Sequence, residues 1–354
     1  MAYNSIRPGQ VWLDDEGKRI QAHGGGVITV DGTFFWYGEN KERTIGVDDT
    51  WHWGVRCYSS KDLYNWHDEG IIIPPVTDDP SSPLCPTSMM DRPHILYNEG
   101  TGKYVAWLKI MGHPSYFAVL VADDVLGPYS LLDHRVRPNM LSVGDFDLDV
   151  DSETRRAYLF SQRPHTSIYT IELTDDYTDV QGNFTEHLLH VAPPESREAP
   201  AHFVRNGRHY LVTSGTTGYN PNPSQVAIAD DWQGPYAVQG VLHPKDRSLT
   251  SFSSQISCVF KYPGENDLYI AIADRWVPGL EEREDFVCGD FYRSVAQKMG
   301  DIFNPDVPFV LSEEDKLAMR TNTSISDYVW LPLVFEGTRV RVDWLDEWRI
   351  EDHL

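Results

Sequence analysis

Short apolar segments, separated by short polar segments, follow one another along most of the chain. Blocks of roughly four to eight residues, rich in β-branched and aromatic side chains, are bounded by Gly, Pro, Asn and Asp, as in β-strands joined by tight turns. Residues 25–39, 92–109 and 199–215 each read as a strand, a turn and a second strand, with Asp-Gly, Gly-Thr-Gly and Asn-Gly at the turns. Residues 145–161 and 255–276 have the same form. The pattern predicts a protein built almost entirely of strands.

Helical patterns are confined to two short segments, 289–298 and 312–319. Strands and helices do not alternate along the chain, and this argues against a doubly wound sheet or a TIM barrel.

The five hairpins recur at nearly even intervals. Each begins with a polar residue that leads into an apolar strand, and these residues are 68, 54, 53 and 57 positions apart: His23, Asp91, Asp145, Glu198 and Gln255. Two of the segments that follow hairpins, 117–131 and 224–238, share the letters ADD and GPY, and 55–66 supplies a similar further strand. A repeat of 50 to 60 residues with about four strands is typical of a propeller blade.

We therefore predict an all-β fold, a five-bladed β-propeller. Five repeats fit residues 20–310, and the strands of 327–350 are expected to close the ring together with 10–15. The whole chain, 1–354, is expected to be one domain. In such a ring the first strand of each blade lines the central channel, so the five polar residues would meet at one mouth.

The composition of the chain argues against nucleic acid and membranes as partners. The formal charge of −23 would repel nucleic acid. The sequence has no run of about 18 apolar residues, so no membrane partner is expected. The first residues have no apolar signal segment, which makes a cytoplasmic location the expectation. Four cysteines without a CxxC pair suggest neither a zinc site nor a disulfide framework.

Two carboxyl groups on adjacent blades suit the hydrolysis of a glycosidic bond. One acid must protonate the leaving oxygen, and burial beside a second carboxylate raises its pKa enough to keep it protonated. Glu198 and Asp145 fit this pairing. Asp145, Asp147, Asp149 and Asp151 fall on one face of a strand, so a central Ca²⁺ is an alternative use of them, although no metal or other cofactor is expected.

Several motifs resemble glycoside hydrolase family 43, and within it the exo-β-1,3-galactanase branch. The similarity covers about residues 10 to 350 and rests on these segments: AHGGG (22–26), FWYGE (35–39), RCYSSKDLYNW (56–66), DRPHILYNEGTGKYVAW (91–107), REAPAHF (197–203), SGTTGYNPN (214–222), SSQIS (253–257) and DRW (274–276).

The resemblance implies a five-bladed propeller, an inverting mechanism and a role for each matching residue. Glu198 matches the general acid, Asp145 the residue that tunes its pKa, and Gln255 the amide thought to hold the attacking water in place of a carboxylate base. Glu39 and Asp91 match acids of the sugar pocket. Either could be the actual proton acceptor, or the amide of Gln255 could act as a base through its imidic tautomer. The domain of residues 1–354 is then expected to be catalytic, without a separate carbohydrate-binding module. The further residues expected to contact sugar are His23, Arg92, Tyr219, Asn220, Asp274 and Trp276.

This sequence departs from the galactanase pattern at two places. Asp91 stands where the branch has Glu, which shortens the side chain by one methylene or about 1.5 Å. His94 replaces the lysine of the RPK motif. His23 is also open to interpretation, either as a group that bonds into the channel or as a satisfied core histidine. Indole faces suit galactose stacking, and Trp36, Trp53, Trp107 and Trp276 are the candidates.

Three functions are compatible with these residues. The first is an exo-acting, inverting hydrolase that releases galactose from β-1,3-linked galactan or arabinogalactan-type oligosaccharides. The second is an α-L-arabinofuranosidase or β-xylosidase of the same family, which usually keeps a base Asp in the first blade that AHGGG lacks. The third is a propeller that binds glycans without cleaving them.

Overall fold

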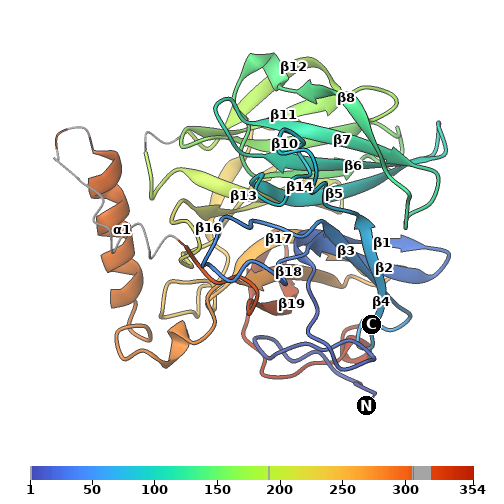
Figure 1. The fold of residues 1–354 in the computed structure, drawn as a ribbon. Coiled ribbons are helices and arrows are strands. Elements are labelled where there is room, and N and C mark those ends of the chain that lie inside the picture. Colours follow the sequence, from blue (N-terminus) through green and yellow to red (C-terminus); the bar gives the residue numbers. More distant parts are fainter. Residues whose placement is uncertain (1, 190–191, 305, 307–319) are drawn as a thin grey trace.

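A computed structural model of the chain describes residues 2–189, 192–304, 306 and 320–354. Within these residues the strands form five four-stranded sheets (Figure 1). Consecutive strands in every sheet pair antiparallel, as hairpins with tight turns require.

The sheets follow one another along the chain. The first contains β1 (His23–Val30), β2 (Thr33–Glu39), β3 (Val55–Ser60) and β4 (His67–Ile73). The second contains β5 (Met90–Asn98), β6 (Lys103–Ile110), β7 (Tyr116–Ala122) and β8 (Ser130–Val136). The third contains β9 (Phe146–Val150), β10 (Ala157–Arg163), β11 (Ser167–Leu173) and β12 (Val180–His187). The fourth contains β13 (Arg197–Arg205), β14 (Arg208–Gly215), β15 (Gln225–Ala229) and β16 (Ala237–Val241). The fifth contains β17 (Gln255–Lys261), β18 (Tyr269–Arg275), β19 (Asp327–Glu336) and β20 (Arg339–Val342).

The first strand of each sheet faces its counterparts around a closed ring. β1 lies beside β5, β5 beside β9, β9 beside β13, β13 beside β17, and β17 beside β1. The inner strands are buried, whereas β8 and β16 at the outside are largely exposed. This arrangement confirms the predicted five-bladed β-propeller and places the start of each first strand at the channel.

Ring closure differs from the prediction. β19 and β20 complete the fifth sheet by themselves, so that blade extends well beyond residue 310. Residues 10–15 do not pair with them; Leu13 bridges to Arg19 instead. The N-terminal segment meets the C-terminal one at Ile6 and Trp348, whose backbones exchange hydrogen bonds of 2.9 and 3.0 Å. The sheet already has four strands, so the N-terminal segment closes the ring mainly through side chains.

An aromatic cluster joins the first and fifth blades. Trp36 of β2 lies with its ring centroid 4.6 Å from that of Trp330 and 4.5 Å from that of Tyr328, both on β19. Trp12 of the N-terminal segment lies 5.2 Å from Trp330. Several of the tryptophans therefore pack between the first and fifth blades, at the point of ring closure where the two sheets share no strand.

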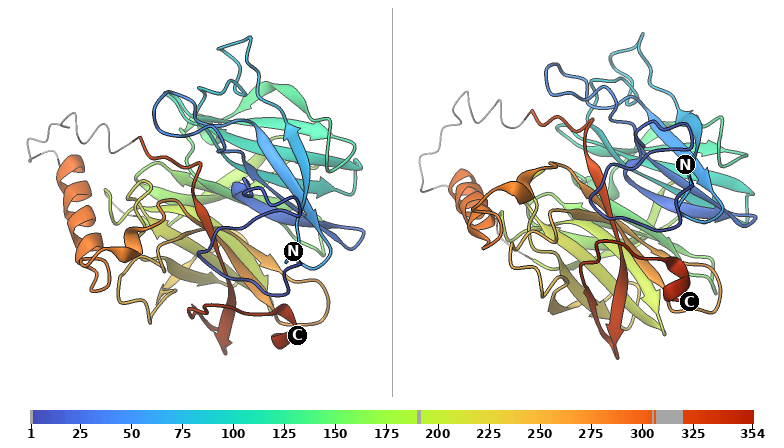
Figure 2. Two further views of the ribbon diagram at one scale, coloured as in Figure 1. Left: turned by 60° about the horizontal axis from the view of Figure 1, so that its bottom comes forward. Right: turned by 90° about the horizontal axis from the view of Figure 1, so that it is seen from below.

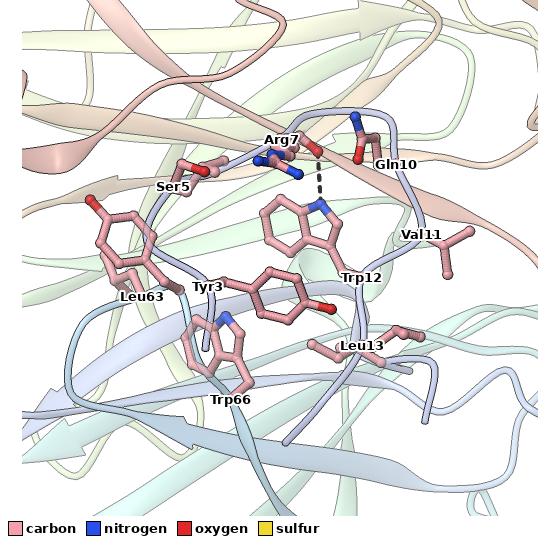
Figure 3. Close-up of a pocket in the computed structure, with 12 residues that line it drawn as sticks. Tyr3, Ser5, Arg7, Gln10, Val11, Trp12, Leu13, Leu63 and Trp66 are labelled. Carbon is pink, nitrogen blue, oxygen red and sulfur yellow. Dashed lines mark hydrogen bonds between the residues drawn. The ribbon is translucent and has the colours of Figure 1, made fainter. Parts of the chain in front are cut away.

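A small hollow lies between the N-terminal segment and the first blade. Figure 3 shows Tyr3, Trp12 and Trp66 around it, with the indole N–H of Trp12 bonded to the carbonyl oxygen of Arg7 at 2.9 Å. Its volume is about 60 Å³, far below the roughly 300–1,000 Å³ of small-molecule sites.

Helices are few and peripheral in the described residues. The α-helix predicted at 289–298 is present as α1 (Asp290–Phe303), in the long connection between β18 and β19, and it stands outside the sheets (Figures 1 and 2). Three short 3₁₀ turns are η1 (Pro138–Met140), η2 (Leu280–Glu282) and η3 (Ile350–Asp352). The predicted helix at 312–319 lies outside the described residues. No described helix combines the length and apolar character that crossing a bilayer requires.

Candidate active site

Local irregularities reorient three of the five blade-entrance residues. The hairpin register shifts just after His23, Asp91 and Glu198. In each case the next residue has a positive φ: 62° at Gly24, 49° at Arg92 and 49° at Ala199. A β-bulge of this kind turns the preceding side chain away from the regular alternation of the strand. Three entrance residues are therefore redirected by backbone geometry and not by side-chain packing alone.

A pocket of about 430 Å³ opens at this mouth. Eight of the eleven predicted site residues line it: Glu39, Asp91, Arg92, Asp145, Glu198, Tyr219, Gln255 and Trp276. These residues come from all five blades. Apart from Asp91 and Arg92, which are adjacent in the sequence, they lie far apart along the chain.

Asp145 lies between two buried cations. Its Oδ2 is 3.0 Å from Nε of Arg92, and its Oδ1 is 2.6 Å from Nζ of Lys109. Burial alone would raise the pKa of Asp145, but Arg92 and Lys109 outweigh that effect and hold the pKa well below its usual range. Asp145 is thus a fixed negative charge near neutral pH.

Glu198 has the opposite protonation behaviour. Burial raises its pKa to about 8, and the charge of Asp145 adds to the rise, while Arg92 and Lys109 work against it. A carboxyl group that keeps its proton near neutral pH can act as a general acid. Burial and the neighbouring Asp145 are thus the two causes of the raised pKa of Glu198.

Glu39 is a second buried carboxyl group of the pocket. Its Oε1 accepts a 2.8 Å hydrogen bond from the backbone N–H of Arg92, and its Oε2 lies 2.7 Å from Nζ of Lys41. Burial raises the pKa of Glu39 to about 7, against the opposing effect of Lys41 and with a further rise from Asp91. A group with this pKa can hold or release a proton near neutrality.

Asp91 is held on both oxygens. Oδ1 accepts a 2.7 Å hydrogen bond from the indole N–H of Trp51, and Oδ2 lies 3.1 Å from Nζ of Lys109. Lys109 therefore bridges Asp91 and Asp145, and its own pKa is raised because these two charges outweigh the cost of its burial.

Gln255 contacts four side chains with its amide. Its Oε1 accepts from Nη2 of Arg92 at 2.7 Å and from the indole N–H of Trp276 at 3.1 Å. Its Nε2 donates to Oγ of Ser214 at 2.9 Å and to Oε1 of Glu198 at 3.3 Å.

Two predicted residues lie beneath the pocket and not on its wall. The ring of His23 is fully buried, with Nδ1 3.0 Å from Oδ1 of Asp274 and Nε2 3.3 Å from the hydroxyl of Tyr328. The other oxygen of Asp274 accepts from the backbone N–H of Gly24 at 3.0 Å. Of the two interpretations of His23, this arrangement corresponds to the satisfied core histidine, since both of its nitrogens have protein partners.

Asn220 also lies off the main pocket. Its side chain donates to the carbonyl oxygen of Thr217 at 3.3 Å, and the residue borders a hollow of about 10 Å³ that Trp276 also lines. Among the candidate stacking residues, Trp36 and Trp107 are buried in the core, and Trp53 lies under the guanidinium of Arg43.

Sequence reasoning missed Lys41, Trp51, Lys109 and Ser214. Two of them could have been found by counting outward from the hairpin turns, because Asp91 pairs with Lys109 and Glu198 with Ser214. The same count links His23 to Glu39 and Gln255 to Asp274. Lys41 and Trp51 lie in the connection between β2 and β3, where strand pairing gives no signal.

The other aspartates of 145–151 and His94 face a different space. Asp147, Asp149 and His94 line a cavity of about 610 Å³ at the other end of the channel. Asp147 accepts from the backbone N–H of His202 at 2.7 Å, and Asp149 lies 2.7 Å from Nδ1 of His202. Strand alternation predicted one face for these aspartates, but Asp145 precedes β9 and lines the pocket at the channel mouth. No group of three or more His, Cys, Asp or Glu side chains in the described residues is arranged to hold a metal ion.

Solved structures of similar shape include several sugar hydrolases. A family 43 β-1,3-galactosidase is 27% identical with a TM-score of 0.76, over 99% of this chain and 64% of the other. A second one, determined with galactodeoxynojirimycin, is 25% identical with a TM-score of 0.74, over 98% of this chain and all of the other (100%). An exo-β-1,3-galactanase from Clostridium thermocellum is 25% identical with a TM-score of 0.72, over 97% of this chain and 66% of the other.

The chain thus spans slightly less than two thirds of the first of these proteins. No curated protein matches the sequence. The family model described as glycosyl hydrolases family 43 matches residues 25–255, which is more than half of the chain. That segment runs from the first strand of the first blade to Gln255 and includes Glu39, Asp91, Asp145 and Glu198. The protein therefore belongs to glycoside hydrolase family 43.

Proposed function

We propose that the protein is an exo-acting, inverting hydrolase that releases galactose from β-1,3-linked galactan or arabinogalactan-type oligosaccharides. The observation that carries this proposal is the pair of carboxyl groups with opposite protonation behaviour in one pocket. Glu198 keeps its proton while Asp145 stays ionised between Arg92 and Lys109. A propeller that only bound glycans would have no need of this difference.

In the proposed step Glu198 gives its proton to the glycosidic oxygen as the bond to the anomeric carbon breaks. A water attacks that carbon from the opposite face and inverts it, and the proton of the water passes to a carboxylate. Glu39 and Asp91 are the candidates for this acceptor, because both line the pocket and neither bridges two cations.

The size and the aromatic wall of the pocket suit a sugar ring. Its volume, about 430 Å³, falls in the lower part of the roughly 300–1,000 Å³ range of small-molecule sites. The rings of Trp51 and Tyr219 lie 6.2 Å apart, and those of Tyr219 and Trp276 lie 5.3 Å apart, so three aromatic side chains form one wall. Such a wall suits the apolar face of a pyranose.

The choice of galactose rests on the similar proteins. Two described as β-1,3-galactosidases and one described as an exo-β-1,3-galactanase share 25% to 27% of residues with this chain. The alternative arabinofuranosidase or xylosidase reading has less support, because the first blade offers His23 and glycines at the place of the usual base Asp.

The test is incubation with β-1,3-galactobiose, arabinan and xylan oligomers, with monosaccharides separated by chromatography. We expect galactose from galactobiose, and a rate roughly 10²–10⁴-fold lower for Glu198→Gln. The first-formed galactose should be the α anomer by NMR. Arabinose or xylose in place of galactose would transfer the proposal to the second reading, and binding without any release would support the third.

A further inference from the structure

The amide of Gln255 has no hydrogen-bonding capacity left for a water. A carboxamide oxygen has two lone pairs and its nitrogen two N–H groups. Arg92 and Trp276 occupy the oxygen, and Ser214 and Glu198 take the two N–H groups.

The orientation of this amide follows from its partners. The guanidinium of Arg92 and the indole of Trp276 only donate hydrogen bonds, so the atom they both approach must be the amide oxygen. The nitrogen is then the atom that faces Glu198. Reversing the amide would set its N–H groups against two donors that have no lone pair to offer.

These contacts connect the amide to the acid. Among the described residues, the one side-chain hydrogen bond to Glu198 comes from Nε2 of Gln255 and goes to Oε1. This contact engages one carboxyl oxygen and leaves Oε2 to carry the proton toward a bound sugar. Arg92 extends the connection, because it binds both Gln255 and Asp145.

We propose that Gln255 is a positioning residue for the acid Glu198 and neither holds the attacking water nor receives its proton. The inference rests on the proposed hydrolysis and revises the role that the family resemblance implied. It leaves the proton of the water to a carboxylate of the pocket, while the proton of Glu198 goes to the leaving oxygen.

The dependence of kcat on the leaving group distinguishes a residue that positions the acid from one that holds the attacking water. A 2,4-dinitrophenolate leaves without protonation, so 2,4-dinitrophenyl β-galactoside needs the water and its acceptor but not the acid. We expect Gln255→Leu to lower kcat on β-1,3-galactobiose by roughly 10²-fold and kcat on the dinitrophenyl substrate by no more than about threefold. Glu198→Gln should give the same split. Equal losses on both substrates would overturn the proposal.

A carboxylate at position 255 gives opposite expectations for the two roles. Gln255→Glu supplies a real base, and if the residue served the water this variant would hydrolyse galactobiose at least as fast as the wild type. As a positioning residue it must fail, because a carboxylate cannot donate to Glu198 and would instead accept the proton of Glu198, holding it away from the leaving oxygen. We expect a loss of at least tenfold on galactobiose near pH 7, about 1.4 kcal/mol of transition-state stabilisation.

A titration that needs no turnover keeps the inference separate from the proposed function. The side-chain ¹³C resonance of Glu198, assigned by its absence in Glu198→Gln, reports the protonation of this carboxyl group directly. Gln255→Leu removes a donor from the ionised form, so the midpoint should rise. Gln162→Leu is the matched control, since it removes an amide from the wall of the same pocket that does not bond to Glu198. An unmoved midpoint in Gln255→Leu would contradict the proposal even in a protein that released no galactose.

Discussion

At the scale of single residues, the candidate site depends on how burial and charge divide two similar carboxyl groups. Glu198 and Asp145 share a pocket, yet Asp145 touches two cations and Glu198 touches an amide. The cations hold the pKa of Asp145 low, although burial opposes them, and burial then keeps Glu198 protonated beside that fixed charge. The difference arises from neighbours on other blades and not from the residue types.

The raised pKa of Glu198 should reduce stability at alkaline pH. An unfolded glutamate titrates near 4.3, whereas burial raises the pKa in the folded protein to about 8. Between these values the folded state binds the extra proton, so the free energy of unfolding falls as pH rises. Glu198→Gln removes this effect, and we expect its Tm to exceed that of the wild type by a few degrees at pH 8.

The comparison is made by calorimetry at pH 4.5 and pH 8. The Tm advantage of Glu198→Gln should be small at the lower pH, where the unfolded glutamate is still partly protonated and the loss of stability has only begun. Glu153→Gln changes an exposed glutamate and controls for loss of net charge. An advantage that was the same at both pH values would argue against a protonated Glu198.

At the scale of the element, the bulged start of the first strand decides where the side chain at the blade entrance points. Gly24, Arg92 and Ala199 take positive φ at equivalent places in three blades. An L-residue pays roughly 1–2 kcal/mol for this conformation, so Arg92 and Ala199 are strained positions held by the surrounding sheet. Regular strands would have sent the preceding side chains to other faces.

Gly24→Ala should therefore impair activity more than its backbone cost suggests. A Cβ at this position would lie 2.6 Å from Oε1 of Glu39, the atom that accepts the backbone N–H of Arg92. Displacement of Glu39 by about 1 Å is expected to lower kcat/KM roughly 10²-fold.

Gly32→Ala is the matched control in the turn of the same hairpin. Gly32 also has a positive φ, 69°, but a Cβ there would meet nothing within 4 Å. Gly32→Ala should lose about 1–2 kcal/mol of stability in denaturant unfolding, the cost of a left-handed L-residue, and Gly24→Ala at least as much, because it also displaces the buried Glu39. Equal activity in the two would show that Glu39 tolerates the added methyl.

At the scale of the whole molecule, the ring is closed by side chains between complete sheets. Tyr328 of β19 stacks on His23 of β1 at a centroid distance of 4.8 Å. Its hydroxyl accepts from the backbone N–H of Ala22 at 2.9 Å and donates to the carbonyl oxygen of Ile20 at 3.1 Å. One phenol thus joins the fifth blade to the first directly beneath the candidate site.

Tyr328→Phe should weaken this closure. It leaves the buried N–H of Ala22 without an acceptor, and an unsatisfied buried donor costs about 1–3 kcal/mol. We expect a lower midpoint in urea unfolding with little change of slope.

Tyr210→Phe provides the comparison, because its hydroxyl donates to the carbonyl oxygen of Thr338, an exposed residue whose carbonyl can bond to water instead. Its loss should be the smaller of the two. A greater loss in Tyr210→Phe would mean that the link between the first and fifth blades contributes little.

The sequence by itself determined the number of blades, the strand that opens each blade and the residues at those openings. These properties are local and periodic: apolar alternation, turn residues and even spacing place Asp91, Asp145, Glu198 and Gln255 at equivalent points of a repeat. The family resemblance added roles for Glu198 and Asp145 because short motifs around them survive intact.

Only the tertiary structure decided which of these side chains meet and what each can still bind. Lys109 neutralises Asp145 across a blade boundary, His23 and Asp274 satisfy each other below the pocket, and the four partners of Gln255 come from four other chain segments. A side chain can form only a limited number of hydrogen bonds, and the number already formed within the protein depends on the distances between blades. No periodicity along the chain encodes those distances, because they arise from the bulges and from the packing that closes the ring.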